Sequence, residues 1–206
     1  MITFSLKQQN ALKASLFVLA LVPFVRLVWA MFTDHLGANP LEFITRNTGD
    51  WTLYMLCLTL AITPLRRLLN LPFLLKSRRM LGLYTFFYAS LHFLTFFWFD
   101  HFFDVAEMLT DVVKRPFILV GFSAFVLLVP LALTSTNKMI KRVGAKRWQQ
   151  LHKLIYVIVS LGVLHYFWMK AGKHDFNQPI IVACMVALML ALRLYWANQK
   201  RLANAV

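Results

Sequence analysis

The sequence predicts an all-α fold, a bundle of six transmembrane helices with both termini in the cytoplasm. Hydrophobic residues make up 60% of the 206 positions, with a mean hydropathy of +0.63, whereas an average soluble domain is roughly 45–50% apolar. The apolar residues fall into six runs, each close to the ~20 residues that cross a ~30 Å hydrocarbon core. Basic residues gather at alternate ends of these runs. Length, hydropathy and charge therefore all favour a multi-pass integral membrane protein.

The six runs are joined by short connections, so we expect one domain over residues 1–206. They are Ala11–Phe32, Trp51–Leu69, Met80–Phe99, Pro116–Leu133, Leu151–Met169 and Ile180–Trp196. The first run has Lys7 before it and Lys13 near its start, and it is longer than the apolar core of a signal peptide, so we expect it to be a retained helix. Pro23, Pro64 and Pro130 lie within runs, where neighbouring helices can satisfy the carbonyls that proline leaves free.

Acidic and basic residues lie on opposite sides of the predicted bundle. All eight acids fall on one side: Asp34, Glu42, Asp50, Asp100, Asp104, Glu107, Asp111 and Asp175. Only a minority of the 22 basic residues share that side, namely Arg26, Arg46, Lys114, Arg115, Lys170 and Lys173. The others occupy the N-terminal segment, the connections 66–79 and 138–153, and the C-terminal end. Because cytoplasmic loops are enriched in Lys and Arg, this second side is predicted to be cytoplasmic.

The net charge of +14 does not indicate a nucleic-acid partner. The basic residues lie at the ends of apolar runs, where they meet the anionic headgroups of membrane lipids, and no basic stretch is interleaved with aromatics in a polar context. Cys57 and Cys184 each lie alone within an apolar run. They are interpreted as packing residues rather than as a disulfide or a zinc site.

The connection from residue 100 to 114 has a helical charge pattern. Asp100, Asp104, Glu107 and Asp111 share one face, and apolar side chains fall mostly on the other. Two interpretations stay open. The segment is either an interfacial helix on the outer leaflet or an acidic docking face for a partner outside the membrane.

Two histidines lie at matched depth in the outer half of the bilayer. At ~1.5 Å per residue, His92 is about 12 Å inside Asp100 and His165 about 7–8 Å inside Lys170. Ionisable side chains at membrane depth are rare and indicate function, and two neutral imidazoles on facing helices can hold a haem iron from opposite sides. We therefore predict a haem between them rather than hydrogen bonds to neighbouring groups. The remaining outer histidines, at positions 35, 101 and 174, are expected to be solvated or interfacial.

His152 lies thirteen residues before His165, ~20 Å towards the cytoplasm on a straight helix. It indicates a second, inner site, although thirteen residues leave the two side chains roughly 140° apart around the axis. Either a π-bulge near Gly162 or a distorted first turn at His152 would correct this rotation. On the helix of His92, the position where a second ligand for this inner site would be expected is occupied by Arg78. Arginine is a poor iron ligand but can pair with a haem propionate or a flavin phosphate.

Several stretches carry a resemblance to a known family. They are Ile62–Arg67 (ITPLRR), Arg78–His92 (RRMLGLYTFFYASLH), Leu133–Tyr156 and Leu164–Trp168 (LHYFW). Together they resemble the ferric-reductase-like transmembrane family, and within it the haem-binding membrane subunits of bacterial periplasmic protein-methionine-sulfoxide reductase systems. The resemblance covers nearly the whole chain.

The resemblance implies b-type haem (heme b), one or two per chain, with His92, His152 and His165 at the family's histidine positions. It also implies flavin mononucleotide (FMN) and, as partner, a periplasmic molybdenum-cofactor methionine-sulfoxide reductase that repairs oxidised proteins. The sequence holds no dinucleotide fingerprint. Electrons are therefore expected from a separate donor, either a cytoplasmic flavin reductase or membrane quinone.

The expected role is thus a redox subunit that performs no substrate chemistry of its own. Three alternatives remain at this stage. The chain could instead be the core of a transmembrane reductase for ferric or other metal ions, or a transporter in which the histidines relay protons. It could also be a structural assembly factor that binds no cofactor.

Overall fold

A computed structural model describes residues 5–172 and 174–203, so Lys173 and Val206, used above, lie outside the described residues. The described chain is helical and contains no strand. Its α-helices are α1 (Leu6–Phe32), α2 (Pro40–Leu68), α3 (Leu75–Thr95), α4 (Val105–Lys114), α5 (Pro116–Leu133), α6 (Asn137–Val143), α7 (Ala145–Leu151), α8 (Ile155–Ala171) and α9 (Asn177–Ala203). Three short segments extend them: η1 (Pro72–Leu74) and η3 (His152–Leu154) are 3₁₀ turns, and η2 (Phe96–Asp100) is a π-helix.

Five helical stretches of the described chain are long and apolar enough to cross a membrane. They are Leu6–Phe32, Pro72–Asp100, Pro116–Leu133, Ala145–Ala171 and Asn177–Ala203. The protein is therefore a multi-pass membrane protein, and the all-α prediction is confirmed. The predicted second span lies in α2, which is not among the five. The count of six spans and their orientation stay predictions.

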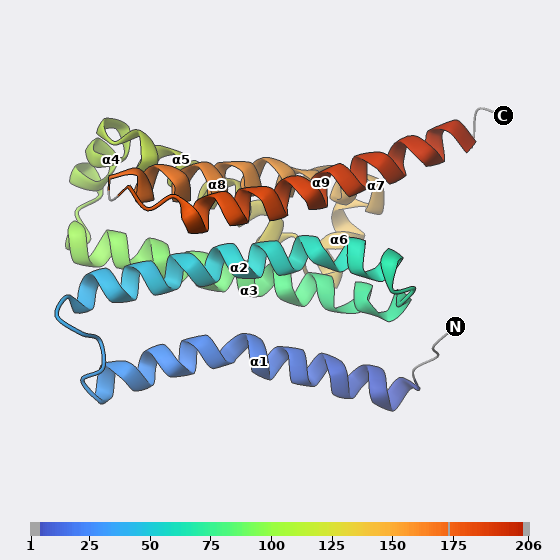
Figure 1. Cartoon of the computed structure of the whole chain (residues 1–206), viewed down its shortest axis with the longest axis horizontal. Coiled ribbons are helices and arrows are strands. Elements are labelled where there is room, and N and C mark those ends of the chain that lie inside the picture. The colour runs from blue at the N-terminus through green and yellow to red at the C-terminus, as the bar shows by residue number, and fades with distance from the viewer. Residues whose placement is uncertain (1–4, 173, 204–206) are drawn as a thin grey trace.

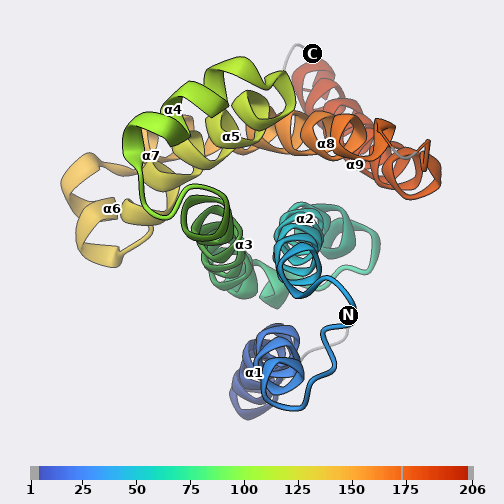
Figure 2. The same cartoon turned by 90° about the vertical axis from the view of Figure 1, so that its left-hand side faces the viewer.

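The long helices run side by side (Figure 1). α2 and α3 pack along each other, α5 packs against α8, and α9 lies on α8 and α2. Seen from the end, α1 is an outlying helix that packs against α2 and α3 (Figure 2). The N- and C-terminal ends of the chain lie at the same end of the bundle, opposite α4. We call the end with the two termini the cationic end and the end with α4 the acidic end.

Helix α2 begins earlier than the apolar run that predicted it. The run starts at Trp51, but the helix starts at Pro40, after Asn39, whose side chain accepts a hydrogen bond from the Glu42 N–H. An Asn N-cap followed by proline is a standard helix start. Hydropathy misses this start because Glu42 and Arg46, in the first two turns, lower the apolar average.

Side chains from other helices bind the backbone at or next to two of the intrahelical prolines. Pro64 has no N–H, so the Leu60 carbonyl lacks its partner in the helix, and Arg193 Nη2 of α9 donates to that carbonyl at 2.5 Å. Beside Pro23, the Tyr88 hydroxyl donates to the Ala20 carbonyl at 2.7 Å and accepts from the Phe24 N–H at 3.2 Å. The kinked helices are thereby tied to their neighbours in the way membrane burial requires.

The fifth predicted span is interrupted at His152 rather than near Gly162. α8 continues without a break past Gly162, whereas residues 152–154 form the 3₁₀ turn η3 between α7 and α8. Of the two corrections considered for the rotation of His152 relative to His165, the structure therefore contains the distorted first turn.

Candidate functional site

A cavity of about 420 Å³ lies between α2, α3, α5 and α8 towards the acidic end. His92 of α3 and His165 of α8 both line it. Most of its wall is apolar, formed by residues such as Leu53, Phe93 and Phe125. Its size falls within the range of roughly 300–1,000 Å³ found for ligand and cofactor sites.

The imidazole of His92 is held by the backbone of α2. His92 Nδ1 lies 2.9 Å from the Thr45 carbonyl oxygen, and the Thr48 hydroxyl is 3.5 Å away. Because a carbonyl only accepts hydrogen bonds, Nδ1 carries the proton and the lone pair is on Nε2. Gly49 makes the approach possible, since a Cβ at this position would lie 3.0 Å from His92 Cε1.

His165 is held in the same manner by α5. Its Nδ1 lies 2.7 Å from the Phe117 carbonyl oxygen, which again leaves the lone pair on Nε2. A Cβ at Gly121 would lie 2.7 Å from His165 Nδ1, closer than real Cβ contacts come. In both cases a glycine four residues after the accepting carbonyl, and so one helical turn beyond it, clears the space for the ring.

The two rings face the same cavity with their centroids 6.2 Å apart. A metal held at about 2.0–2.1 Å from one nitrogen of each ring would put the centroids roughly 6 Å apart. Nowhere in the described residues do three His, Cys, Asp or Glu side chains gather as a metal site. Two imidazoles with oriented lone pairs therefore suit an iron whose other ligands come from a macrocycle, as in haem. The residues fit the group.

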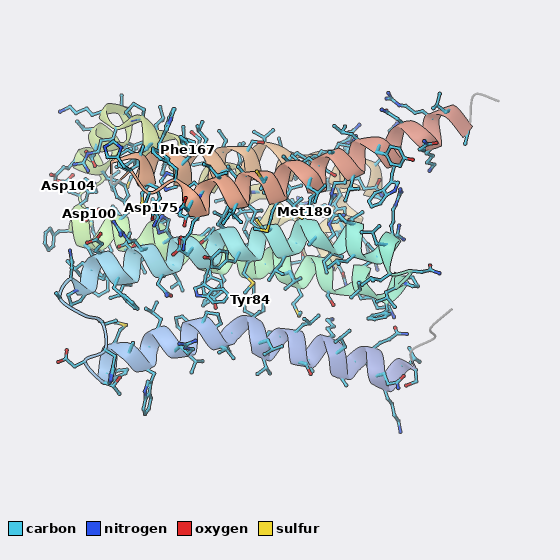
Figure 3. All side chains as sticks on the ribbon, viewed as in Figure 1. Tyr84, Asp100, Asp104, Phe167, Asp175 and Met189 are labelled. Atoms are coloured by element: carbon cyan, nitrogen blue, oxygen red, sulfur yellow. The ribbon has the colours of Figure 1, made fainter. Side chains whose placement is uncertain are left out.

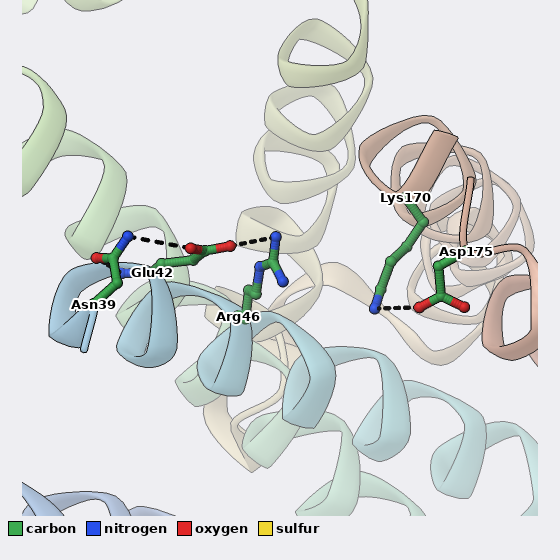
Figure 4. Close-up of polar contacts among 5 residues, drawn as sticks. All are labelled: Asn39, Glu42, Arg46, Lys170 and Asp175. Atoms are coloured by element: carbon green, nitrogen blue, oxygen red, sulfur yellow. Dashed lines mark hydrogen bonds and ion pairs between the residues drawn. The ribbon is translucent and has the colours of Figure 1, made fainter. Parts of the chain in front are cut away.

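Charged residues surround the acidic-end mouth of this cavity. Arg46 pairs with Glu42, one turn earlier on α2, and Asn39 Nδ2 donates to the same carboxylate at 3.1 Å (Figure 4). Lys170 pairs with Asp175 at 3.1 Å. Figure 3 places Asp175, with Asp100 and Asp104, at this same end. The mouth is thus polar while the histidines are set deeper, among apolar side chains.

His152 is not part of this cavity. Its Nδ1 is 3.0 Å from the Trp148 carbonyl oxygen, and its ring packs on Trp148 with centroids 4.0 Å apart. His152 Nε2 is buried and has no hydrogen-bond partner among the described residues. The lone pair of a third imidazole is therefore presented inside the bundle, at a separate place.

A half-buried cation, Arg78, lies near His152 at the cationic end. Arg78 interacts electrostatically with both His152 and Arg193. Arg193 donates to the Tyr156 hydroxyl at 3.0 Å, while its Nε is buried without a partner in the described chain. Half-buried cations without a carboxylate partner are costly, so Arg78 and Arg193 suit the carboxylate or phosphate of a bound cofactor.

The other histidines of the acidic end have local contacts. His35 Nδ1 lies 2.9 Å from the Thr33 hydroxyl. His101, expected to be solvated or interfacial, is buried, with only 5% of its surface exposed. Its Nε2 lies 3.4 Å from an Asp111 carboxylate oxygen, but the contact does not have the geometry of a hydrogen bond. The prediction of a solvated or interfacial His101 is wrong in its first part, because the ring is buried against Phe96 and beside Asp111 of α4.

Some of the carboxylates expected to form an acidic face on residues 100–114 bind groups of the chain itself. Asp104 is the N-cap of α4 and accepts from the Glu107 N–H at 2.9 Å. Asp111 binds Arg115 at 2.8 Å as well as contacting His101. Val105 and Leu109 are exposed on α4. These observations favour the interfacial helix over a continuous acidic docking face.

The sequence-based interpretation missed the residues that hold the rings. Thr45, Gly49, Phe117 and Gly121 were not singled out, because backbone carbonyls leave no trace in composition. The available signal was one glycine in each helix that packs beside a histidine helix, Gly49 in α2 and Gly121 in α5, at the depth of the histidine rings.

Comparison with known proteins identifies the family of the chain. The sequence pattern of the family described as "Ferric reductase like transmembrane component" matches residues 48–163. The chain belongs to this family. The match includes His92, Gly49 and Gly121 and the first part of α8 up to Val163, and His165 lies two residues beyond it.

Curated members of the ferric-reductase-like family are similar over almost the whole chain. A protein of Herminiimonas arsenicoxydans named protein-methionine-sulfoxide reductase heme-binding subunit MsrQ is 68% identical over 99% of this chain and 94% of its own length. Proteins of the same name from Ralstonia nicotianae and Polaromonas naphthalenivorans are 57% and 55% identical, over 92% and 93% of this chain and 88% of their own lengths. No solved structure matches the chain. The family membership places the protein in the bacterial inner membrane.

Proposed function

We propose that the chain is the haem-binding, electron-transferring membrane subunit of a protein-methionine-sulfoxide reductase system. The observation that carries the proposal is the pair His92 and His165, which face one cavity with rings 6.2 Å apart and with each Nδ1 hydrogen-bonded to a backbone carbonyl. The names of relatives that are 55–68% identical support the same function.

The chain's own residues would fix the ligand geometry. His92 and His165 would hold the haem iron through Nε2, with their rings fixed by the Thr45 and Phe117 carbonyls and with Gly49 and Gly121 giving the clearance. A b-type haem bound there would supply reversible one-electron transfer at iron. The apolar wall excludes water and, with the charged mouth, sets the electrostatic environment that tunes the reduction potential.

The donor and acceptor belong to the same proposal. We assign the acceptor as a periplasmic molybdenum-cofactor methionine-sulfoxide reductase and the donor as a cytoplasmic flavin reductase or the quinone pool. A single centre near the acidic end cannot bridge a ~30 Å core. His152 with Arg78 and Arg193 is therefore proposed as the place of a second redox centre, either haem or FMN.

The optical spectrum of the purified protein tests the haem site. Wild-type protein from haem-replete cells is expected to show reducible low-spin b-type bands. His92→Ala and His165→Ala should each abolish the bands of the haem at this cavity, because one axial ligand is lost, while the protein still inserts in the membrane. Haem content by extraction and membrane level by immunoblot would be measured on the same samples.

His35→Ala is the matched control, since His35 lies outside the cavity and bonds only locally to Thr33. It should keep the wild-type spectrum. Unchanged spectra and haem content in both the His92 and His165 variants would reject the assignment. A colourless wild-type protein would reject haem binding altogether and return the proton-relay alternative.

A further inference from the structure

A second cavity, remote from the histidines, lies at the cationic end between α1 and the start of α3. It has a volume of about 390 Å³ and is lined by the first turns of α1, by η1 and by the first turn of α3. Three of its lining side chains are cationic: Lys13, Lys76 and Arg79. Leu12, Phe73 and Leu75 provide apolar surface beside them.

No carboxylate side chain of the described residues lines this cavity, and the sequence around its lining residues contains none. The chain has no Asp or Glu before Asp34, and none between Asp50 and Asp100. Asp34 follows the far end of α1, which is 27 residues long, or roughly 40 Å at 1.5 Å per residue. The cavity therefore combines three positive charges with no acidic side chain among its lining residues.

The hydrogen bonds of these cations leave their charge uncompensated. Lys76 Nζ donates to the Gln9 side-chain carbonyl at 2.8 Å, and Arg79 Nη1 donates to that of Asn137 at 2.5 Å. Both acceptors are neutral amides. A lysine ammonium has three donors and a guanidinium five, so both groups keep donors for an anion. Meanwhile the amides fix the direction in which the two side chains point.

The position of the cavity indicates what kind of anion would enter it. It opens at the end of long apolar helices, where lipid headgroups lie, and it is bordered by apolar side chains on one side. It also lies on the seam between α1 and the rest of the bundle, and α1 is the outlying helix of Figures 1 and 2. Of the α1 side chains described, only Ala20, Pro23 and Leu27 are buried, so the first turns of α1 have little packing of their own.

We propose that this cavity is a phosphate-ester site, occupied by the headgroup of an anionic phospholipid, that ties the first turns of α1 to α3. Lys13 contributes from α1, and Lys76 and Arg79 from α3, so one phosphate would bridge the two helices. Arg79 can present a bidentate fork to phosphate oxygens, and the lysines act as point charges.

Native mass spectrometry of the full chain tests the site. Protein would be reconstituted in bilayers of equal parts phosphatidylglycerol and phosphatidylcholine and then released. Wild type is expected to retain phosphatidylglycerol in preference to phosphatidylcholine. The triple variant Lys13→Gln/Lys76→Gln/Arg79→Gln should retain it about tenfold less or worse, since each basic contact near an anionic surface adds to the attraction.

A triple variant with the same charge change elsewhere is the control. Lys138, Lys141 and Lys146 are exposed residues of α6 and α7 outside the cavity, and their replacement by Gln should leave lipid retention unchanged. A charge-preserving variant, Lys13→Arg/Lys76→Arg/Arg79→Lys, should retain lipid. If the neutral triple variant does not fold, Lys76→Gln alone should lower retention about threefold, which keeps the test decisive.

A parallel arm separates lipid from soluble phosphate. Excess inorganic phosphate or FMN would be added to wild type and to the neutral triple variant in neutral detergent. Binding that depends on the three cations and displaces phosphatidylglycerol would assign the same site to a soluble phosphate ester. Equal lipid retention and equal phosphate binding by wild type and the neutral variant would overturn the proposal, whatever the haem content of the protein.

Discussion

At the scale of single residues, two histidines are set by the same local device. Each ring donates its Nδ1–H to a carbonyl of a facing helix, and a glycine one turn further along that helix removes the Cβ that would meet the ring. The hydrogen bond fixes the tautomer and therefore leaves Nε2 as the ligand atom. The position and the ligand atom of each ring are therefore set by uncharged residues, namely Thr45, Gly49, Phe117 and Gly121.

Replacing Gly121 by alanine tests this device. The new Cβ would lie 2.7 Å from His165 Nδ1, and the ring could move away only by giving up its bond to Phe117. Overpacking of this kind costs about 1–3 kcal/mol, so we expect haem affinity to fall about tenfold. Haem titration of the apoprotein followed by difference spectroscopy measures it.

Gly82→Ala provides the comparison for Gly121→Ala. Gly82 also lies within a helix, but a Cβ there would meet Thr59 Cγ2 only at 3.8 Å, an ordinary contact. This variant should bind haem like wild type and unfold at the same or a higher temperature, because alanine is the better helix former. Equal haem affinity in both alanine variants would show that the ring does not need the clearance.

At the scale of helices, hydropathy and histidine spacing predicted much of the arrangement. The run Pro116–Leu133 coincides with α5, and the matched depths predicted the proximity of His92 and His165. The first part of α2 was not predicted, because Glu42 and Arg46 interrupt the apolar pattern although they belong to the cavity wall. The rotation of His152 was ambiguous because a three-residue 3₁₀ turn has no clear sequence signature.

The proline of α2 gives a test at the same scale. Arg193→Met would leave the Leu60 carbonyl without a donor, whereas Pro64→Ala would restore a backbone N–H for that carbonyl. We therefore expect the loss of stability from Arg193→Met to be smaller by about 1 kcal/mol when Pro64→Ala is present. Thermal unfolding of the two single variants and the double variant in one detergent gives this coupling. A coupling of zero would mean that the two residues act independently.

At the scale of the whole molecule, charge separates the two ends. The ion pairs found among the described residues join Glu42, Asp111 and Asp175 with nearby cationic or histidine side chains, all at the acidic end, while the cations of the opposite end have no acidic partners in the described chain. Such an asymmetry orients a membrane protein through its Lys and Arg residues. We expect reporters fused after Val206 or inserted near Lys141 to read cytoplasmic, and one near Asp104 to read periplasmic. The reverse pattern would invert the direction of electron flow.

The direction of electron transfer is the last prediction and depends on both ends. His92 and His165 lie towards the acidic end, where a periplasmic reductase could accept electrons, and His152 lies with Arg78 and Arg193 nearer the cationic end. In vesicles with the reductase only on the periplasmic side and reduced flavin only on the cytoplasmic side, sulfoxide reduction should require this subunit. The rate should fall sharply in His92→Ala. In His152→Ala the spectrum of the His92/His165 site should be kept, while its reduction from the flavin side slows. Turnover only with quinol would move electron entry into the membrane, and equal turnover without the subunit would exclude the route.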